Sequence, residues 1–528
     1  MLSYKSITEK LQKVNQTTSL KVQSAWLLFA KTIGFGLSFL LPLLIVRYLT
    51  QEKVGVYRQV FQIILNVVTI LPLGFSMSAF YFLSRETERR KLAVFNILIF
   101  NFAVGGLACL TLFLFPQLPG NLFHSEDITR LAPLIGIVIW LWIFSGFLET
   151  VAIANQETGM ATAFIISAQF TKTALMAGAV IVFATVESFI YAAMVQAGLQ
   201  TIVLLVYLNS RFPRFWQKFD GKFFLEQSLY ALPFGFAALL WTLQTDIHNY
   251  FVGYHFSAAE YAIYAYGCFQ IPLIAMLSES VNSVLIARMS ELQATGDKRE
   301  IIRLTARAMQ KLASVYFPLY IFLAIEGATF VTTLFTRNYL ASVPIFEINL
   351  LLLPLGIFIT DAVFRAYREL GRLLLVLRGF ILIALVAALY FGIQHFDLSG
   401  MIAIVVAAVF VDKFISTVIA WRKIGVKFED IRLLKGVGKT ALASLTAGAA
   451  TVLFDWFLGE KIVVWSANLT QAVLPSAKQG LMNFVSGVLV LSVSALVFAP
   501  LYFALMNWFG LLEDGEKNLF KKIFGRKN

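Results

Sequence analysis

The chain has 528 residues, of which 59% are hydrophobic and only 14% are charged. Soluble globular proteins carry about 25% charged and 45–50% apolar residues, so this composition excludes a soluble domain, a disordered regulator and a secreted disulfide scaffold. The formal net charge is +13, and the two cysteines, Cys109 and Cys268, lie far apart in apolar runs, so they predict neither a disulfide framework nor a metal site.

Fourteen apolar stretches, each long enough to cross a bilayer as a helix of about 20 residues, follow one another along the chain. The first is too long for the apolar region of a signal peptide, so we interpret it as a retained membrane span. The connections are short, and no soluble domain is expected between them. The predicted spans are 24–46, 56–83, 92–115, 131–154, 161–184, 188–208, 228–250, 259–285, 312–335, 343–364, 372–393, 399–420, 440–457 and 480–507.

Lys and Arg are distributed unevenly between the two sides of these spans. The N-terminal arm, the even-numbered connections and the C-terminal tail hold 32 basic residues, and the odd-numbered connections hold seven. The positive-inside rule therefore predicts that both termini face the cytoplasm. The same asymmetry explains the high net charge without a nucleic-acid partner. The terminal segments 1–21 and 511–528 place apolar residues at helical spacing among lysines, which suits short helices on an anionic membrane surface as well as simple solvated tails.

The chain repeats itself weakly, with an offset close to 210 residues. Tyr48–Tyr57 (YLTQEKVGVY) matches His255–Tyr264 (HFSAAEYAIY), and Glu157-Thr158-Gly159 matches Glu369-Leu370-Gly371. Six spans separate the copies, so both enter the membrane in the same direction and a pseudo-twofold axis is expected along the membrane normal. We predict an all-α membrane protein with a first lobe at 22–210, a second lobe at 211–424 and an additional pair of spans at 425–510.

Several segments resemble the multidrug/oligosaccharidyl-lipid/polysaccharide (MOP) transporter superfamily. Arg47–Tyr57 resembles its connection between helices 1 and 2, where an acidic residue precedes Gly-x-Tyr, and Tyr367–Arg372 (YRELGR) resembles the end of its helix 10. Arg288–Glu300 and Phe335–Leu353 also resemble segments of this superfamily. Phe29–Phe35 resembles the start of the lipid II flippases, with Lys31 where that branch carries Arg. Among its branches, the Wzx-type polysaccharide flippases look most similar.

The resemblance implies a transporter of the bacterial cytoplasmic membrane rather than an enzyme, without a cofactor. Its expected substrate is a polyprenyl-diphosphate-linked oligosaccharide, which would move from the cytoplasmic to the outer leaflet by alternating access of a cationic central cavity. Membrane lipids and other polysaccharide-assembly proteins are the other expected partners. Two alternatives remain open at this point: a cation-coupled multidrug exporter of the same superfamily, and a membrane polysaccharide polymerase or ligase.

Basic residues within the predicted spans are the candidates for binding the substrate. A charge at the centre of a membrane helix costs about 2.5–3.5 kcal/mol on insertion scales, so each one needs a partner or a cavity. A diphosphate favours Lys or Arg because of charge-assisted hydrogen bonds. The candidates are Lys31, Arg58, Lys172 and Arg378, although pairing with a neighbouring acid or extension to the interface would explain them too.

Acidic residues and one histidine within the spans are candidates for coupling or gating. Glu149 and Asp361 differ by 212 positions and are therefore equivalent in the repeat, and Arg365, one turn after Asp361, is its expected partner. Asp246 and His248, near the outer end of the seventh span, could bind a coupling proton or sodium ion. Prolines within spans, such as Pro72, predict bends at these positions.

Overall fold

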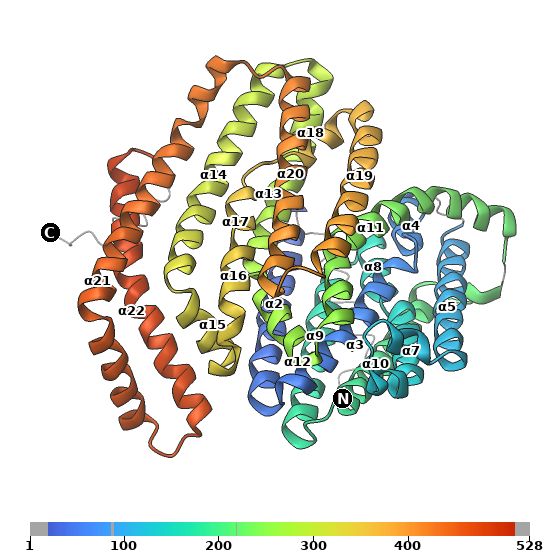
Figure 1. Ribbon diagram of the computed structural model, residues 1–528. Coiled ribbons are helices and arrows are strands. Elements are labelled where there is room, and N and C mark those ends of the chain that lie inside the picture. Colours follow the sequence, from blue (N-terminus) through green and yellow to red (C-terminus); the bar gives the residue numbers. More distant parts are fainter. Residues whose placement is uncertain (1–19, 86–88, 218, 513–528) are drawn as a thin grey trace. The chain divides into compact units, whose positions relative to one another are not determined.

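The computed structural model describes residues 20–85, 89–217 and 219–512, and every regular element in this part of the chain is a helix (Figure 1). Eleven of these helices are long and apolar enough to cross a membrane, or twelve if the bent pair 51–70 and 75–83 forms one span. The predicted all-α polytopic architecture is confirmed, whereas the count of fourteen spans is not. The segments 1–21 and 511–528 lie, apart from their inner ends, outside the described residues.

The chain divides into two compact units, 1–262 and 263–528. Helix α11 (Gly221–His255), which our predicted lobe boundary assigns to the second lobe, belongs to the first unit because it packs on α3 (Gln51–Ile70), α4 (Ser78–Arg85) and α5 (Arg90–Leu114). These units are defined by packing rather than by symmetry, so the lobes of the repeat stay a prediction.

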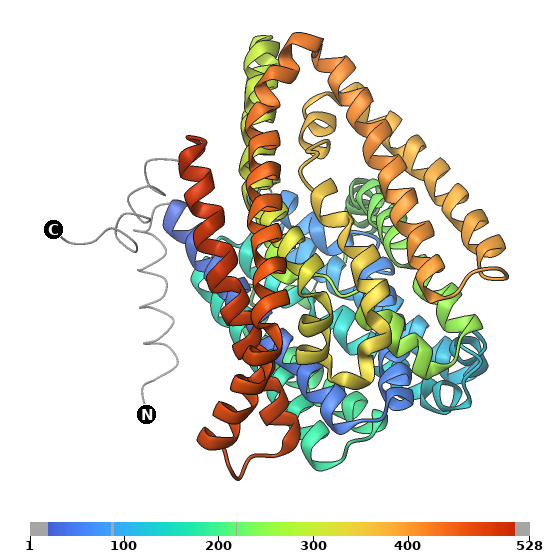
Figure 2. The same cartoon turned by 60° about the vertical axis from the view of Figure 1, so that its left-hand side comes forward.

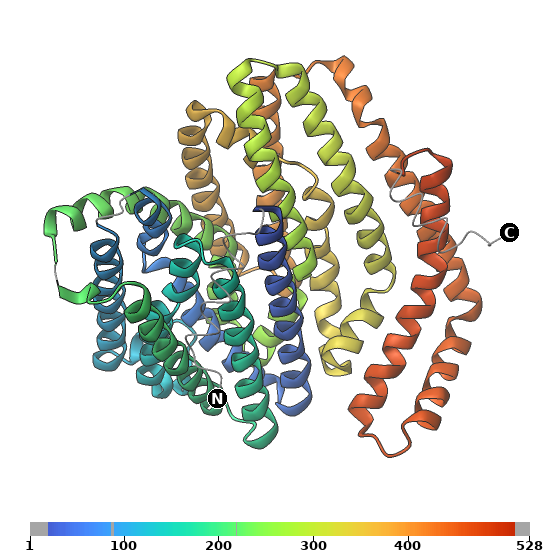
Figure 3. The same cartoon turned by 180° about the vertical axis from the view of Figure 1, so that it is seen from behind.

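In the first unit, α2 (Leu20–Tyr48) lies along α9 (Thr158–Val182), as Figure 3 shows from behind. Helix α7 (Glu126–Ser145) packs between α5 and α10 (Val186–Arg211) and also contacts α3. The remaining elements of this unit are α6 (Gln117–Asn121), α8 (Phe147–Ala154), the 3-10 turns η1 (Phe75–Met77) and η2 (Phe215–Gln217), and the start of α12 (Ala258–Gly267).

Side-chain caps fix where several helices begin. Thr50, Ser125 and Thr185 accept hydrogen bonds from backbone N–H groups in the first turns of α3, α7 and α10, and Asp220 does so for α11. Each cap satisfies an N–H that has no partner within its helix. The helices therefore start at short polar residues between apolar runs.

Pro72 marks the bend that its position in the sequence predicts. Helix α3 ends at Ile70, and the chain continues through η1 into α4 at an angle of 48°. Gly74 supports the turn with a φ of +69°, a left-handed conformation that glycine adopts without strain. The bend lies next to a core in which Phe75, Phe82, Phe147 and Phe223 are almost completely buried.

Gly55 allows α3 to lie directly against the start of α12 in the first unit. A Cβ atom at this position would overlap the backbone carbonyl of Ala258. The neighbouring Val54, Val56 and Tyr57 are buried as well. The glycine of the Gly-x-Tyr sequence is therefore required by a close backbone approach.

The second unit continues with α13 (Pro272–Thr295), α14 (Lys298–Ile325) and α15 (Gly327–Phe335). Shorter pieces follow before two long helices, α19 (Arg368–Gly392) and α20 (Leu398–Ile424). The shorter pieces are η3 (Arg337–Ser342), α16 (Val343–Leu350), α17 (Leu352–Leu355) and α18 (Asp361–Ala366). The 3-10 helix η4 (Phe428–Leu434) then leads into the last two helices, α21 (Lys435–Val473) and α22 (Gln479–Trp508).

Helices α21 and α22 form a long hairpin that packs on α14 and α15 (Figure 2). Small residues permit the close contact, since a Cβ atom at Gly448 would overlap Ile321 and one at Gly487 would overlap Thr333. The predicted additional pair of spans at 425–510 corresponds in sequence to this hairpin.

Candidate functional site

Lys172 is the basic candidate that the structure describes most clearly. It lies on α9 in the first unit, half-buried, with its Nζ 4.6 Å from the centre of the Trp142 ring. Among the described residues, no carboxylate lies within ion-pair distance of this ammonium group. A cation–π contact of this kind is worth about 0.5–2 kcal/mol, and it does not occupy the N–H donors of Lys172 with a hydrogen-bond acceptor.

Trp142 is itself held by a chain of amide groups. Its Nε1 donates to Oε1 of Gln196 at 3.0 Å, Nε2 of Gln196 donates to Gln200 at 2.6 Å, and Gln200 donates to the carbonyl of Ser145 at 3.3 Å. This network joins α7 to α10 and fixes the orientation of the indole ring. The ring position beneath Lys172 is therefore preorganised by side chains that carry no charge.

A second polar seam in the first unit joins α3 to α11. Gln62 donates to the Asp246 carboxylate at 3.1 Å, and Asn66 donates to the Tyr250 hydroxyl at 3.1 Å. One turn nearer the start of α3, the side-chain amide of Gln59 donates to the backbone carbonyl of Gly253 at 3.5 Å. The polar residues recur at intervals of three and four on α3, so that they form one stripe along the helix.

Asp246 lies within this seam, and the nearby His248 is almost completely buried, with 6% of its surface exposed. The two residues belong to the same helix but point in different directions, because they are two positions apart. Their proposed roles in coupling stay predictions.

In the second unit, Arg378 on α19 and Asp361 on α18 form an ion pair of 3.4 Å. Arg365, the partner that helical spacing predicts for Asp361, is exposed and makes no ion pair with it. The prediction of that pair was wrong because α18 ends at Ala366 and α19 supplies the closer cation. Asp412 on α20 is within electrostatic reach of Arg378, Lys413 and Asp361, so Arg378 lies in a cluster of mixed charge.

The other candidates are placed as follows. Arg58 lies half-buried on α3, and Glu149 lies half-buried on α8, immediately after the break at Gly146. Lys31 belongs to α2, but its side chain lies outside the described residues. Helix α2 is packed against α9, with Gly34 close to Gln169, so Lys31 and Lys172 belong to neighbouring helices of the first unit.

The repeated Glu-x-Gly sequences occupy equivalent places in the two units. Glu157 forms an ion pair of 2.8 Å with Arg211 at the end of α10. Glu369 forms an ion pair with Lys423 at the end of α20, and Lys423 also lies over the Tyr367 ring at 5.4 Å. Arg211 and Lys423 are 212 positions apart, as Glu157 and Glu369 are, so the structure adds an equivalent contact to the sequence repeat.

A family model for a polysaccharide biosynthesis protein matches residues 63–344, just over half of the chain. The chain belongs to this family. No curated protein matches it. Because the family match begins at residue 63, it covers Lys172, Trp142 and the α11 side of the α3–α11 seam, but on α3 it includes Asn66 and leaves out Gln59 and Gln62.

Solved structures share the fold. The lipid II flippase MurJ in an inward closed conformation superposes with a TM-score of 0.63 at 13% identity, over 91% of this chain and 99% of that chain. An inward-facing multidrug resistance MATE transporter of the MOP superfamily gives 0.60 at 16% identity, over 74% and 94% of the two chains. A MOP superfamily transporter from Pyrococcus furiosus gives 0.56 at 16% identity, over 76% and 95%.

The chain is therefore a member of the polysaccharide biosynthesis family with the fold of the MurJ flippase and of the MATE transporters. Trp142, Gln196, Gln62 and Asn66, which hold the candidate residues in place, were missed in the sequence. They are uncharged, whereas the candidates predicted from the sequence are ionisable groups within the spans. Amides in strongly apolar helices are the signal that could have identified them.

Proposed function

We propose that this polysaccharide biosynthesis protein moves a polyprenyl-diphosphate-linked oligosaccharide from the cytoplasmic to the outer leaflet of the bacterial inner membrane by alternating access. The observation that supports this most is the ammonium group of Lys172, held over Trp142 with no described carboxylate to neutralise it. A lysine in this state offers charge-assisted hydrogen bonds to a phosphate oxygen.

The surroundings of Lys172 suit an anionic headgroup with polar substituents. Trp142 provides an aromatic face beside Lys172, and Gln196 and Gln200 hold this ring in place. Gln59, Gln62 and Asn66 supply amides in the separate α3–α11 seam of the same unit. By contrast, the Arg378 guanidinium in the second unit already faces Asp361. We therefore assign the first contact with the diphosphate to the first unit, through Lys172 and, on the neighbouring helix, Lys31.

The direction of transport is favourable for an anion. Each negative charge that leaves a negative interior gains about 2.3 kcal/mol per 100 mV of membrane potential. A diphosphate with two negative charges gains about twice this amount. Flipping in this direction therefore does not require a coupling ion, although Asp246 and His248 stay candidates for one.

The test is a flip assay in proteoliposomes with a fluorescent polyprenyl-diphosphate disaccharide, where a membrane-impermeant quencher reports the leaflet of the label. Removing a hydrogen bond to a charged group costs about 1.5–3 kcal/mol, so Lys172→Ala is expected to slow flipping about 10- to 100-fold. Lys172→Arg should retain part of the rate. Lys461→Ala, which changes an exposed lysine of α21, is the matched control.

Equal rates in the parent and in a well-folded Lys172→Ala variant would contradict the assignment. The alternative function, export of cationic compounds coupled to a cation, is favoured by one observation: the Asp246 carboxylate accepts from Gln62 within the first unit. Uptake of a cationic dye into inverted vesicles that depends on Asp246 but not on Lys172 would support this alternative instead.

A further inference from the structure

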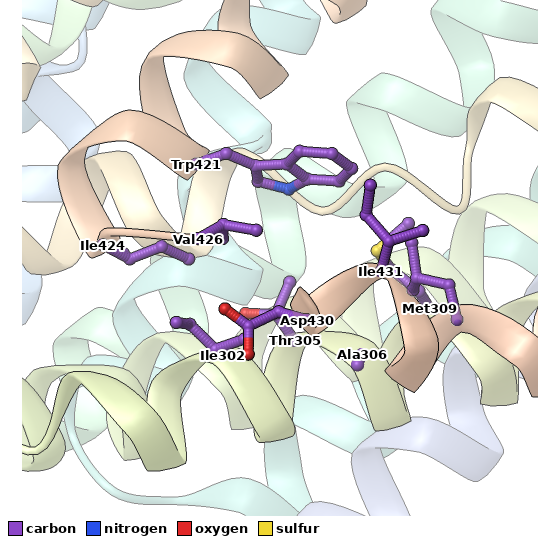
Figure 4. A pocket seen from close by; sticks show the side chains of 10 residues that line it. Ile302, Thr305, Ala306, Met309, Trp421, Ile424, Val426, Asp430 and Ile431 are labelled. Atoms are coloured by element: carbon purple, nitrogen blue, oxygen red, sulfur yellow. The ribbon is translucent and has the colours of Figure 1, made fainter. Parts of the chain in front are cut away.

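A pocket in the second unit lies between α14, the end of α20 and η4 (Figure 4). Ile302, Thr305 and Met309 of α14 form one wall, and Trp421, Ile431 and Leu434 form the other. It is a shallow groove that opens to the surface, and its empty volume, open mouth included, is about 340 Å³. Almost all of its lining is apolar.

Basic residues recur next to the residues that line this pocket. Six of the ten lining residues are followed directly in the sequence by Lys or Arg, and all six of these basic side chains are exposed. Arg303 and Arg307 share Glu300 at 3.6 Å each. The other four make no ion pair among the described residues. They are Arg422, Lys427, Arg432 and Lys435.

The pocket also has features typical of a membrane interface. Trp421 lies in the last turn of the apolar helix α20, where aromatic side chains commonly mark the boundary between lipid and water. Helix η4 exposes Phe428 (88% exposed), Ile431 and Leu433, and its charged residues are Glu429, Asp430 and Arg432, with Lys427 and Lys435 at its two ends. Exposed apolar side chains among charged ones are typical of elements at a membrane interface.

We propose that this pocket binds an anionic phospholipid of the leaflet that it faces, with an acyl chain in the apolar groove and the phosphate among the basic side chains around it. The charge complementarity is the argument for this occupant, because basic pockets between membrane helices attract anionic headgroups. A neutral or cationic amphiphile would gain nothing from the six cations. The inference does not depend on which substrate the protein transports.

Asp430 is the charged residue of the lining, and it provides a sensitive test. Its carboxylate accepts from the backbone N–H of Lys427 at 2.8 Å, and Figure 4 shows it on the side of the pocket near Ile302, across from the Trp421 indole. An anionic lipid is repelled by this carboxylate. Asp430→Asn keeps an oxygen that can accept the same hydrogen bond, so it is expected to bind an anionic lipid more tightly.

The experiment measures thermal unfolding of the purified full-length protein in detergent micelles titrated with phosphatidylglycerol or, separately, phosphatidylcholine. Phosphatidylglycerol is expected to raise the unfolding temperature with a saturable dependence, and phosphatidylcholine is not. Each basic residue near an anionic headgroup contributes about 1 kcal/mol, or about fivefold in affinity. A triple variant with Arg422, Lys427 and Arg432 changed to Gln should therefore need about 100-fold more phosphatidylglycerol.

A matched triple variant, Lys91, Arg214 and Lys222 changed to Gln, removes three exposed charges from the first unit and should respond like the parent. Ala306→Phe, which fills the groove, should abolish the response without changing the charge. Equal responses of the two triple variants, an equal effect of phosphatidylcholine, or weaker phosphatidylglycerol binding by Asp430→Asn would each overturn the proposal.

Discussion

Glu157 and Arg211 form a largely buried ion pair, with side chains that are 11% and 17% exposed. Asn155 donates to the same carboxylate at 3.0 Å and also accepts from Arg90 at 2.9 Å. The pair therefore ties the start of α9 to the end of α10 and, through Asn155, to α5. The equivalent pair in the second unit, Glu369 with Lys423, is much more exposed, at 58% and 34%.

This difference predicts unequal effects of two equivalent substitutions. Arg211→Ala leaves a buried carboxylate without its cation, which costs about 3–5 kcal/mol when a buried pair is broken. Lys423→Ala breaks an exposed pair and should cost less than about 1 kcal/mol. Chemical or thermal unfolding of the two variants in the same detergent measures the difference, and equal losses would show that exposure does not control the strength of these pairs.

The stability of the first unit should also depend on the protonation of Glu157. Burial raises the pKa of the Glu157 carboxyl above its usual value, and Arg211 opposes this shift only in part. The folded chain then holds this proton to a higher pH than the unfolded chain does, so the contribution of Glu157 to stability falls as the pH rises between the two pKa values. Glu157→Gln removes this dependence. The unfolding temperature of the parent relative to Glu157→Gln should decrease across this window, and a difference that increases with pH would contradict the direction.

The contributions of Arg378 and Asp361 to the free energy of unfolding are expected to depend on each other. Either Arg378→Gln or Asp361→Asn breaks this partly buried ion pair, which we estimate to cost about 2 kcal/mol. The double variant removes both charges and should be more stable than the sum of the single losses predicts, as a double-mutant cycle would measure. If the stable double variant loses the flipping activity that we propose, whereas Asp361→Asn alone retains it, Arg378 is assigned to substrate binding as well.

Gly55 should not tolerate even one additional carbon atom. In most exposed helix positions, Gly→Ala stabilises a helix by up to about 1 kcal/mol. At Gly55 the new methyl group meets the backbone of Ala258, which cannot move as a flexible side chain can, so Gly55→Ala is expected to lower the unfolding temperature. Gly178→Ala is the matched control, since a Cβ atom there meets nothing within 4 Å.

The sequence predicts the architecture well because its signals are local. Apolar length predicts a polytopic helical protein, Pro72 predicts the bend between α3 and α4, and the repeated Glu157 and Glu369 predict equivalent positions in the two halves. The number of spans does not follow from apolar length in the same way, because some helices are broken. Broken helices such as α12 with α13 contain turns and polar residues, so length and hydropathy alone do not define them as single spans.

The partners of charged residues are not local, and they could not be predicted in this way. Helical spacing suggests Arg365 for Asp361, yet Arg378 comes from the following helix, 17 positions away. Lys172 is in contact with an aromatic ring rather than with an acid, and no rule of spacing connects residues 142 and 172. Such pairs depend on how helices pack, which the apolar pattern determines only in outline.

The two equivalent ion pairs have a consequence for the stability of each unit. Each pair joins residues 54 positions apart in the sequence, and both partners of a pair belong to the same unit. Each ion pair therefore stabilises only the unit that contains it, and breaking one pair leaves the equivalent pair of the other unit intact.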